Sequence, residues 1–198
     1  MTDEENGIKV ILLGETYVGK TSLIKAALGQ KFDASELTTF TSSYSVKKFK
    51  YNGQEYVFNL WDTIGQEKYR SLTKMFFKDS KIIILVYDIT AKKTFEQLDY
   101  WYTQLVNQLG TSGYILAIVG NKKDLFIKEE VNEAQGKEFA KEKNAKFKLS
   151  SAKEDPVSFT NFLEEIFKEF IDNNKDFLER KKGTSLSVPG DKKKKKCC

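Results

Sequence analysis

The chain has 198 residues, of which 40% are hydrophobic, so it is long enough for one well-buried domain and too short for two. It contains no His, and its two Cys are the last two residues, which excludes Ser-His-Asp and Cys-His catalysis and leaves zinc without its usual ligands. The net charge of +5 is concentrated in one place: eight basic and two acidic residues follow residue 178, so residues 1–178 carry about −1. A near-neutral body with a basic appendage does not indicate a nucleic-acid-binding protein, which spreads basic groups over a folded face.

The sequence shows no sign of a membrane span or of a leader. No stretch approaches the roughly 18–20 apolar residues that cross a bilayer. The first seven residues, MTDEENG, are acidic and lack an apolar core, and position 2 is not Gly, so we expect neither a signal peptide nor myristoylation. We therefore expect a protein that is made and kept in the cytosol.

Strand-like and helix-like segments alternate along the chain. Apolar runs predict six strands, at 9–13, 44–51, 54–61, 82–87, 115–119 and 147–149, with Asn52-Gly53 as a two-residue hairpin turn. Apolar residues at helical spacing predict helices near 21–28, 95–109, 133–143 and 159–170. This order predicts an α/β fold: a doubly wound, mostly parallel six-stranded sheet with one antiparallel edge strand and helices on both faces. We expect a flexible N-terminus (1–7), one domain (8–172) and a flexible basic tail (173–198).

Residues 14–21, Gly-Glu-Thr-Tyr-Val-Gly-Lys-Thr, fit the phosphate-binding pattern G-x-x-x-x-G-K-[ST] between a predicted strand and a predicted helix. Consecutive backbone N–H groups can curl around phosphates, helped by the helix N-terminus, while Lys20 lies between the β- and γ-phosphates and the Thr21 hydroxyl ligates Mg²⁺. Alone, the pattern indicates a nucleoside triphosphate or a related phosphate ligand, and a chance match in a glycine-containing loop is the alternative. The candidate residues are Gly14, Glu15, Thr16, Tyr17, Val18, Gly19, Lys20, Thr21 and Ser22.

A base-reading motif follows the fifth predicted strand, at the carboxyl end where open parallel sheets bind ligands. The Asp124 carboxylate can accept hydrogen bonds from N1–H and the 2-amino group of guanine, and adenine offers neither donor. Ser151-Ala152-Lys153, after the sixth strand, can supply a backbone N–H to guanine O6 and a lysine beside the base. An ordinary polar strand exit is the alternative for the first motif by itself. The candidate residues are Asn121, Lys122, Asp124, Ser151, Ala152 and Lys153.

Residues 62–66, Asp-Thr-Ile-Gly-Gln, follow the second strand of the hairpin. Asp62 can hold a metal through a water, the Gly65 N–H can bond a γ-phosphate, and Gln66 can orient an attacking water, which makes it the candidate catalytic residue. Because a D-x-x-G turn is common, this motif indicates nucleotide binding only in combination with the other two motifs.

In this order the motifs resemble the Ras superfamily of small GTPases over roughly residues 8–172, and the segments WDTIGQEKYRSL, YDITAKKTF and WYTQL resemble its Rab family. The resemblance implies a P-loop GTPase fold and a GTP/GDP switch that uses Mg²⁺, hydrolyses GTP and regulates vesicle trafficking. It also implies that Phe32 packs edge-on against guanine and that Thr39, the position selected by counting from both flanking motifs, binds Mg²⁺ with Thr21 and Asp62.

The same resemblance implies partners. These are GTP and GDP, an exchange factor, a GTPase-activating protein, effectors, an escort protein and a GDP-dissociation inhibitor, while nucleic acid is not expected and the chain is expected to be a monomer. Tyr44, Trp61 and Phe76 fall where Rabs carry aromatic residues that face effectors, and core aromatics at strand ends are the alternative.

Three residues depart from the Rab pattern. Ile64 stands where Ala is usual, Thr41 where Gly is usual, and Tyr17 is large for its loop. The β-branched Ile64, two residues before Gln66, predicts slow intrinsic hydrolysis, and no arginine is placed to act in cis, so a partner would supply one. A GTP-binding scaffold with negligible hydrolysis is the alternative, and a P-loop small-molecule kinase is disfavoured because residues 121–124 indicate guanine.

The chain ends in Lys192–Lys196 followed by Cys197-Cys198. Two lipid chains, or one chain with a basic patch, anchor a protein stably, and each lysine near an anionic leaflet adds ~1 kcal/mol. The Rab resemblance implies geranylgeranyl groups on both cysteines and a place on the cytosolic face of endomembranes. A solvated basic tail or a nuclear-import signal is the alternative.

Overall fold

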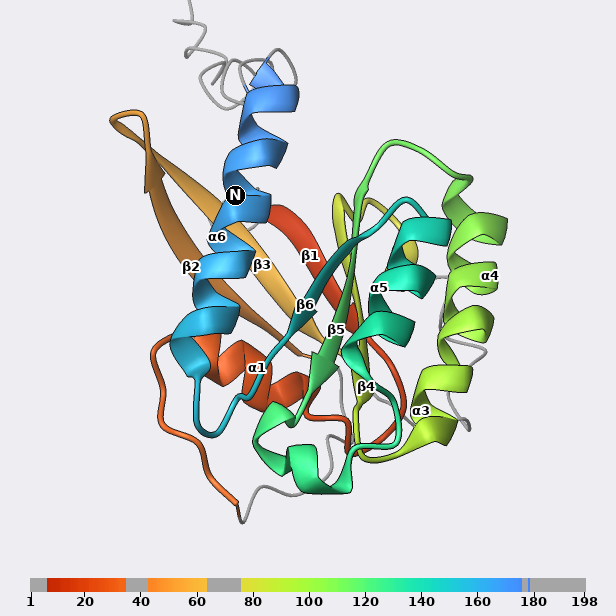
Figure 1. The fold of residues 1–198 in the computed structure, drawn as a ribbon. Coiled ribbons are helices and arrows are strands. Elements are labelled where there is room, and N and C mark those ends of the chain that lie inside the picture. Colours follow the sequence, from red (N-terminus) through yellow and green to blue (C-terminus); the bar gives the residue numbers. More distant parts are fainter. Residues whose placement is uncertain (1–6, 35–42, 64–75, 176–177, 179–198) are drawn as a thin grey trace, which may run out of the picture.

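A computed structural model of the chain describes residues 7–34, 43–63, 76–175 and 178. Within this part of the chain, six strands form one sheet in the order β2-β3-β1-β4-β5-β6 (Figure 1). The strands are β1 (Ile8–Leu13), β2 (Ser43–Tyr51), β3 (Gln54–Asp62), β4 (Ile82–Asp88), β5 (Ile115–Asn121) and β6 (Lys146–Leu149). β2 is antiparallel to β3 at one edge, and every other neighbouring pair is parallel. The predicted doubly wound sheet with one antiparallel edge strand is therefore confirmed.

The hairpin of β2 and β3 closes through the turn that its sequence requires. Asn52 has φ 49° and Gly53 has φ 75°, so both central residues lie in the left-handed region. This pair of angles is typical of the type I′ turn, whose twist matches that of the flanking strands, and Asn-Gly is its preferred sequence. Tyr51 consequently pairs with Gln54, and Tyr44 pairs with Trp61 near the other end of the ladder.

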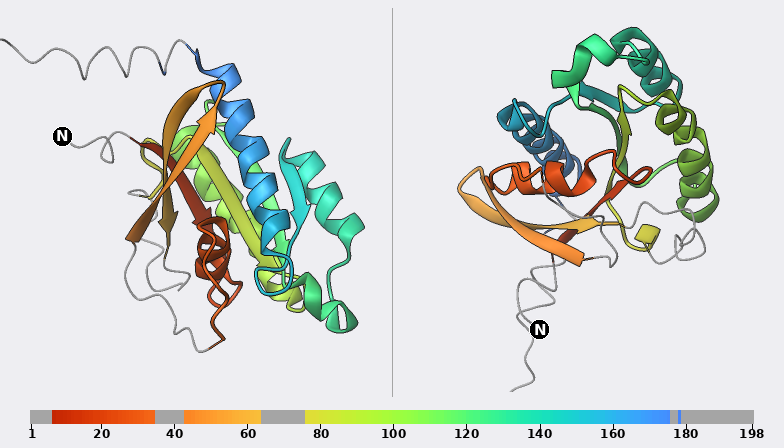
Figure 2. Two further views of the ribbon diagram at one scale, coloured as in Figure 1. Left: turned by 90° about the vertical axis from the view of Figure 1, so that its left-hand side faces the viewer. Right: turned by 90° about the horizontal axis from the view of Figure 1, so that it is seen from below.

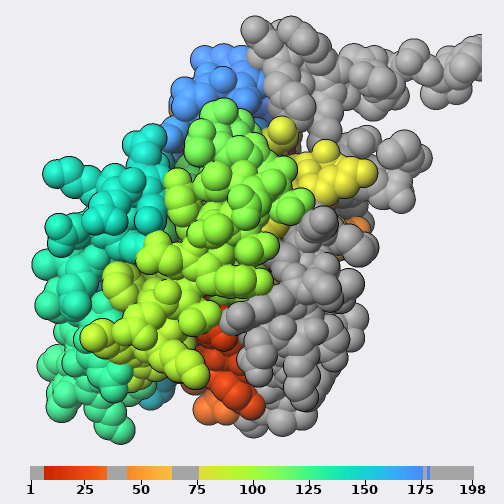
Figure 3. All heavy atoms as spheres, turned by 90° about the vertical axis from the view of Figure 1, so that its right-hand side faces the viewer, coloured from red at the N-terminus to blue at the C-terminus, as the bar shows by residue number. Residues whose placement is uncertain are grey.

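Helices cover both faces of the sheet (Figure 2). One face carries α1 (Lys20–Ala27) and α6 (Pro156–Asn173), which contact each other, and the other carries α3 (Lys92–Glu96), α4 (Leu98–Leu109) and α5 (Glu133–Glu142). Figure 3 views the molecule from the side of these last three helices. A short 3₁₀ segment, η2 (Lys123–Lys128), follows β5.

Each buried strand supplies side chains to two hydrophobic cores. Along β1, Val10 and Leu12 pack with α1 and α6, whereas Ile11 and Leu13 pack with α4 and α5. Successive strand residues point to opposite faces, which is why a continuous apolar run suits a strand covered on both sides. The closest aromatic pair of the first core stacks Phe58 of β3 on Phe167 of α6, with ring centroids 3.6 Å apart.

Two helix starts are fixed by side chains that accept backbone N–H groups. Asp155 accepts from the Ser158 N–H at 3.1 Å, and Pro156 follows it as the first residue of α6. Asn132 and Gln135 form a reciprocal capping box before α5, at 3.0 and 2.9 Å.

The structure differs from the predicted elements in two places. The single helix predicted over 95–109 is α3 followed by α4, with Gln97 between them. η2 was not predicted, because its residues show no helical periodicity beyond one turn. The predicted N-terminal and C-terminal flexible segments lie almost entirely outside the described residues.

Candidate functional site

The loop between β1 and α1 has a backbone that two glycines make possible. Gly14 has φ 147° and Gly19 has φ 94°. A Cβ on Gly14 would stand 2.1 Å from the Val86 carbonyl oxygen, and one on Gly19 would stand 2.3 Å from Nδ2 of Asn121. Both positions therefore exclude side chains by conformation and by space. Tyr17, between them, also has a positive φ of 66°, and its side chain is 75% exposed.

Lys20 lies folded back along this loop. Its Nζ donates hydrogen bonds to the carbonyl oxygens of Gly14 and Glu15, at 3.0 and 2.9 Å, and only 6% of the residue is exposed. Burial lowers the pKa of Lys20 to about 8, although the nearby Asp62 and Glu15 carboxylates favour the charged form. A cation held this way, among backbone groups and away from water, is poised to bind phosphate.

Thr21 and Asp62 meet beside the loop although they are 41 residues apart. The Thr21 hydroxyl donates to Oδ2 of Asp62 at 2.6 Å, and Asp62 is buried at the end of β3. A hydroxyl and a carboxylate are hard oxygen ligands, which Mg²⁺ prefers, and Mg²⁺ is usually held by one or two such groups plus substrate phosphates. The donor set therefore fits a magnesium ion at this position.

A cavity of about 330 Å³ lies next to the phosphate-binding loop. It is formed where β5 and β6 end and where the chain leaves α1, the carboxyl edge at which open parallel sheets bind ligands. Its lining includes Phe32, which is 41% exposed, and Asp124. The remaining lining residues are Gly19, Ser22, Ala34, Asn121, Lys122, Leu125, Ala152 and Lys153.

Asn121 ties the two halves of the site together. Its Nδ2 donates to the Val18 carbonyl oxygen at 2.8 Å, and its Oδ1 accepts from the Ala152 N–H at 3.3 Å. The amide therefore connects the phosphate-binding loop with the segment after β6 and is itself 2% exposed. Its position reflects a structural role in addition to any contact with a ligand.

The Asp124 carboxylate is oriented by a neighbouring hydroxyl. Ser151 donates to Oδ1 of Asp124 at 2.6 Å and its Oγ accepts from the Glu154 N–H at 2.9 Å. Each carboxylate oxygen has two lone pairs, so Asp124 keeps acceptor capacity for a ligand in the cavity.

Two contacts at the site were not predicted from the sequence. Lys122, whose φ is 67°, forms an ion pair with Oδ2 of Asp88 at 2.6 Å. Asp88 is the last residue of β4 and pairs with Asn121 of β5 in the parallel register. Because Asp88 follows a predicted parallel strand, the sequence indicated that it would lie at the same edge of the sheet as Asn121. The indole N–H of Trp101 donates to Oε1 of Glu15 at 3.2 Å, which connects α4 with the phosphate-binding loop.

The three candidate effector-facing aromatics differ in exposure. The rings of Tyr44 and Trp61 stack with centroids 5.1 Å apart, and Nζ of Lys9 lies 4.7 Å from the Trp61 ring. Tyr44 is 44% exposed, whereas Phe76 is only 9% exposed and belongs to the buried set. Tyr44 and Trp61 thus offer a surface, and Phe76 fits the alternative of a core aromatic.

Several predicted residues lie outside the part of the chain that the structure describes. These are Thr39, Thr41, Ile64, Gly65, Gln66, Cys197 and Cys198. Among the helices that are described, no helix is both long and apolar enough to cross a membrane.

Comparison with known proteins places these observations in context. The family model described as "Ras family" matches residues 9–174. The chain is 34% identical to human Rab-22A over 191 residues, covering 96% of this chain and 97% of that protein. It is 37% identical to human Rab-21 over 182 residues, covering 92% and 80%, and 34% identical to SEC4 of Saccharomyces cerevisiae over 199 aligned positions, covering 96% and 91%.

Proposed function

Because the chain belongs to the Ras family and is a Rab-like small GTPase, which hydrolyses GTP and regulates vesicle trafficking, we propose that its described cavity holds guanine and its Gly14–Thr21 loop holds the phosphates. The observation that supports this most directly is the Asp124 carboxylate, oriented by Ser151 in a cavity beside that loop. The Rab relatives work with regulators and effectors and act on the cytosolic face of endomembranes.

Guanine recognition follows from the polar groups at the cavity. Asp124 accepts from N1–H and the 2-amino group, Phe32 packs against the edge of the base, and the stem of Lys153 flanks it. The backbone of residues 151–152 lies close enough to Asn121 to share a hydrogen bond, so this segment is held in place before a base arrives. A held acceptor discriminates strongly, because the wrong base leaves it unpaired.

Phosphate binding uses the loop backbone and Lys20. Backbone N–H groups of residues 15–22 surround the β-phosphate, and the Lys20 ammonium exchanges its two carbonyl partners for phosphate oxygens. Ras-family GTPases use Mg²⁺ with the nucleotide, and we assign Thr21, Asp62 and Thr39 as the residues that hold it here. When bound, the ion would neutralise negative charge on the phosphates.

Hydrolysis and switching depend on residues outside the described part of the chain. In the proposal, Gln66 orients the attacking water and the Gly65 N–H bonds the γ-phosphate, so the second switch distinguishes GTP from GDP. A GTPase-activating partner supplies an arginine. An exchange factor, an escort protein and a GDP-dissociation inhibitor complete the cycle, and Tyr44 and Trp61 form part of the surface that effectors contact.

Anchoring is assigned to the tail. Cys197 and Cys198 carry the lipids, and Lys192–Lys196 add attraction to an anionic leaflet. The domain itself, about residues 8–172, works as a monomer in this proposal.

Replacing one carboxylate oxygen of Asp124 by an amide nitrogen tests the assignment of the cavity to guanine. Asp124→Asn replaces an acceptor oxygen by a donor amide opposite the donors of guanine, so we expect GTP affinity to fall at least about a hundredfold. Affinity for xanthosine triphosphate should rise, because its base carries an acceptor where guanine has its amino group. Competition binding with both nucleotides measures the change.

Glu154→Gln is the matched control, because it changes a neighbouring carboxylate that does not line the cavity. Its GTP affinity should stay within about threefold of the parent. Unchanged GTP affinity in Asp124→Asn would refute the assignment of the cavity to guanine.

A further inference from the structure

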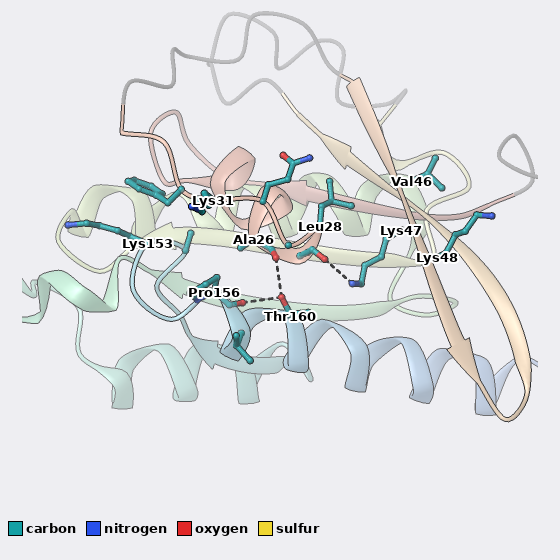
Figure 4. A pocket seen from close by; sticks show the side chains of 15 residues that line it. Ala26, Leu28, Lys31, Val46, Lys47, Lys48, Lys153, Pro156 and Thr160 are labelled. Carbon is teal, nitrogen blue, oxygen red and sulfur yellow. Dashed lines mark hydrogen bonds between the residues drawn. The ribbon is translucent and has the colours of Figure 1, made fainter.

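A second and larger hollow lies on the other side of Phe32. It is a groove of about 1000 Å³ between the end of α1 with the segment that follows it, the middle of β2 and the first turns of α6 (Figure 4). We call it the α1–α6 groove. Phe32, Ala152 and Lys153 also line the base cavity, and no role has been assigned above to the rest of the groove.

The lining of the α1–α6 groove combines apolar surface with one sign of charge. Leu28, Val46, Pro156 and Val157 supply apolar side chains, and Val157 is 63% exposed. Four lysines contribute to the lining, and among the described residues that line the groove there is no Asp or Glu. Figure 4 shows Lys31 and Lys153 toward one end and Lys47 and Lys48 toward the end formed by β2.

The four lysines differ in whether they form ion pairs with described residues. Lys47 donates to the Ala27 carbonyl oxygen at 2.8 Å and lies 3.5 Å from Glu164, and Lys48 lies 3.3 Å from Glu55. For Lys31 and Lys153 the described residues provide no ion-pair partner. The end of the groove beside the base cavity therefore presents two ammonium groups that an anionic ligand can reach.

The shape of the groove favours a protein segment over a lipid headgroup. Leu28 and Val46 line the hollow and are half-buried in it. The side chains of a peptide can reach them there, whereas a flat bilayer surface cannot.

We propose that the α1–α6 groove docks an acidic, amphipathic peptide segment of a partner protein. Apolar side chains of the segment pack on Leu28, Val46 and Val157, and its carboxylates pair with Lys31 and Lys153. The charge complementarity sets the orientation and speeds association, while the burial of the exposed apolar surface supplies affinity.

Occupancy of the groove is coupled to the base cavity, and this part rests on the proposed guanine site. Phe32, Ala152 and Lys153 line both hollows, so they form the wall between them. A segment that packs on the groove side of Phe32 stabilises the position in which the ring also lines the base cavity. Docking should therefore raise the affinity for GDP, which we expect to appear as slower release, and GDP should raise the affinity for the peptide by the same factor as its own affinity rises.

The docking half is tested with a synthetic probe. A fluorescent peptide of about a dozen residues, rich in Glu with Leu at helical spacing, is titrated with the full chain, once without added nucleotide and once with GDP, and followed by anisotropy. The same peptide with Lys for every Glu is the charge control. We expect binding of the acidic peptide alone, and perturbed amide NMR signals at Leu28, Val46 and Val157.

Two variants identify the surface without touching the assigned nucleotide site. Lys31→Glu reverses the accessible charge, and Val157→Asp places a carboxylate on the apolar floor, so each should weaken peptide binding by about fivefold or more. Lys141→Glu makes the same charge reversal on α5, on the opposite face of the sheet, and should leave affinity within about twofold. Equal peptide affinity in all three variants would overturn the proposal.

A vesicle-binding experiment tests the alternative ligand of the groove, an anionic lipid. With Cys197 and Cys198 replaced by Ser and Lys192–Lys196 replaced by Gln, so that the tail contributes neither lipid nor charge, the protein is mixed with phosphatidylserine vesicles at low salt. If Lys31→Glu abolishes vesicle binding while the acidic peptide does not bind, the groove recognises lipid and the proposal is wrong.

The coupling between the α1–α6 groove and the base cavity is measured in a separate experiment. We expect saturating acidic peptide to slow dissociation of a fluorescent GDP analogue by about fivefold or more, and Val157→Asp to remove this effect. Peptide binding with an unchanged dissociation rate would refute the coupling and leave docking standing. Failure of the GDP analogue to bind would instead refute the proposed nucleotide site, because the peptide titration does not depend on it.

Discussion

Lys20 is buried in the proposed phosphate-binding loop, so its protonation should depend on what that loop binds. Burial lowers its pKa from 10.5 to about 8, so between pH 8 and 10.5 the folded chain without nucleotide binds fewer protons here than the unfolded chain. The contribution of Lys20 to the free energy of unfolding therefore rises with pH across this window. A bound phosphate reverses the balance, because it favours the ammonium form.

This reversal predicts proton uptake when GDP binds. The uptake at Lys20 should grow from about a tenth of a proton at pH 7 to about half a proton at pH 8, because the unliganded group is then half neutral. Calorimetry at each pH in two buffers with different ionisation enthalpies measures it. Binding heats that are independent of the buffer at pH 8 would contradict the lowered pKa.

At the scale of single residues, the sequence was most informative where a motif is continuous. The glycine positions of the phosphate-binding loop follow directly from G-x-x-x-x-G-K-[ST], and the structure shows the conformations that require them. The bridge from Asn121 to the Val18 carbonyl joins residues 103 positions apart. No local sequence pattern specifies which carbonyl a side-chain amide will donate to. The contact between Asn121 and Val18 could therefore be identified only from the folded structure.

At the scale of elements, the packing of β3 against α6 depends on one aromatic pair. Phe167 is fully buried and stacks on Phe58, and its ring also meets Phe49 edge-on with centroids 5.7 Å apart. Phe167→Ala should lower the free energy of unfolding by about 3–5 kcal/mol, because it removes buried surface and leaves a cavity. Urea unfolding in excess GDP measures the loss.

The matched control for this prediction is Phe126→Ala on η2. The Phe126 side chain is 65% exposed, so its removal should change the free energy of unfolding by less than about 0.5 kcal/mol. Similar losses in the two variants would show that the stacked pair does not hold α6 on the sheet.

Element prediction succeeded where periodicity and turn chemistry agreed. Asn52-Gly53 predicted the hairpin because only left-handed residues close a type I′ turn, and the structure has both angles. The division between α3 and α4 escaped prediction because Gln97, at φ −73° and ψ −10°, stays in the helical region, so the apolar spacing continues through it. η2 escaped because it is stabilised by strand-exit contacts such as Lys123 N–H to the Ser150 carbonyl, not by an apolar face.

At the scale of the whole molecule, the proposed lipid anchor can be tested separately from the charge of the tail. Replacing Cys197 and Cys198 by Ser leaves all five tail lysines, whose attraction to anionic lipid is reversible and weakened by salt. Two isoprenoid chains bury tens of CH₂ equivalents at ~0.8 kcal/mol each, which salt hardly affects. The parent protein from its own cells should therefore remain with membranes through a high-salt wash, and the double-Ser variant should be soluble.

A complementary variant isolates the charge. Changing Lys192–Lys196 to Gln while keeping both Cys should leave the protein on membranes, because two lipid chains suffice. Sedimentation of both variants, with GDP binding as a check on folding, is the measurement. Cofractionation of the double-Ser variant with membranes would assign the anchoring to charge or to a protein partner.

The central place of β1 in the sheet also has a consequence for how the protein is made. β1 is translated first, but its parallel neighbours come much later: Val10 pairs with Leu60 and with Ile82, the latter 72 residues further along the chain. At synthesis rates of ~5–20 residues per second, the apolar strand waits about 4–14 s for its second neighbour. The charges that stand beside this segment, Lys9 and the acidic residues at positions 3–5, are of the kind that discourages an exposed strand from pairing with other chains.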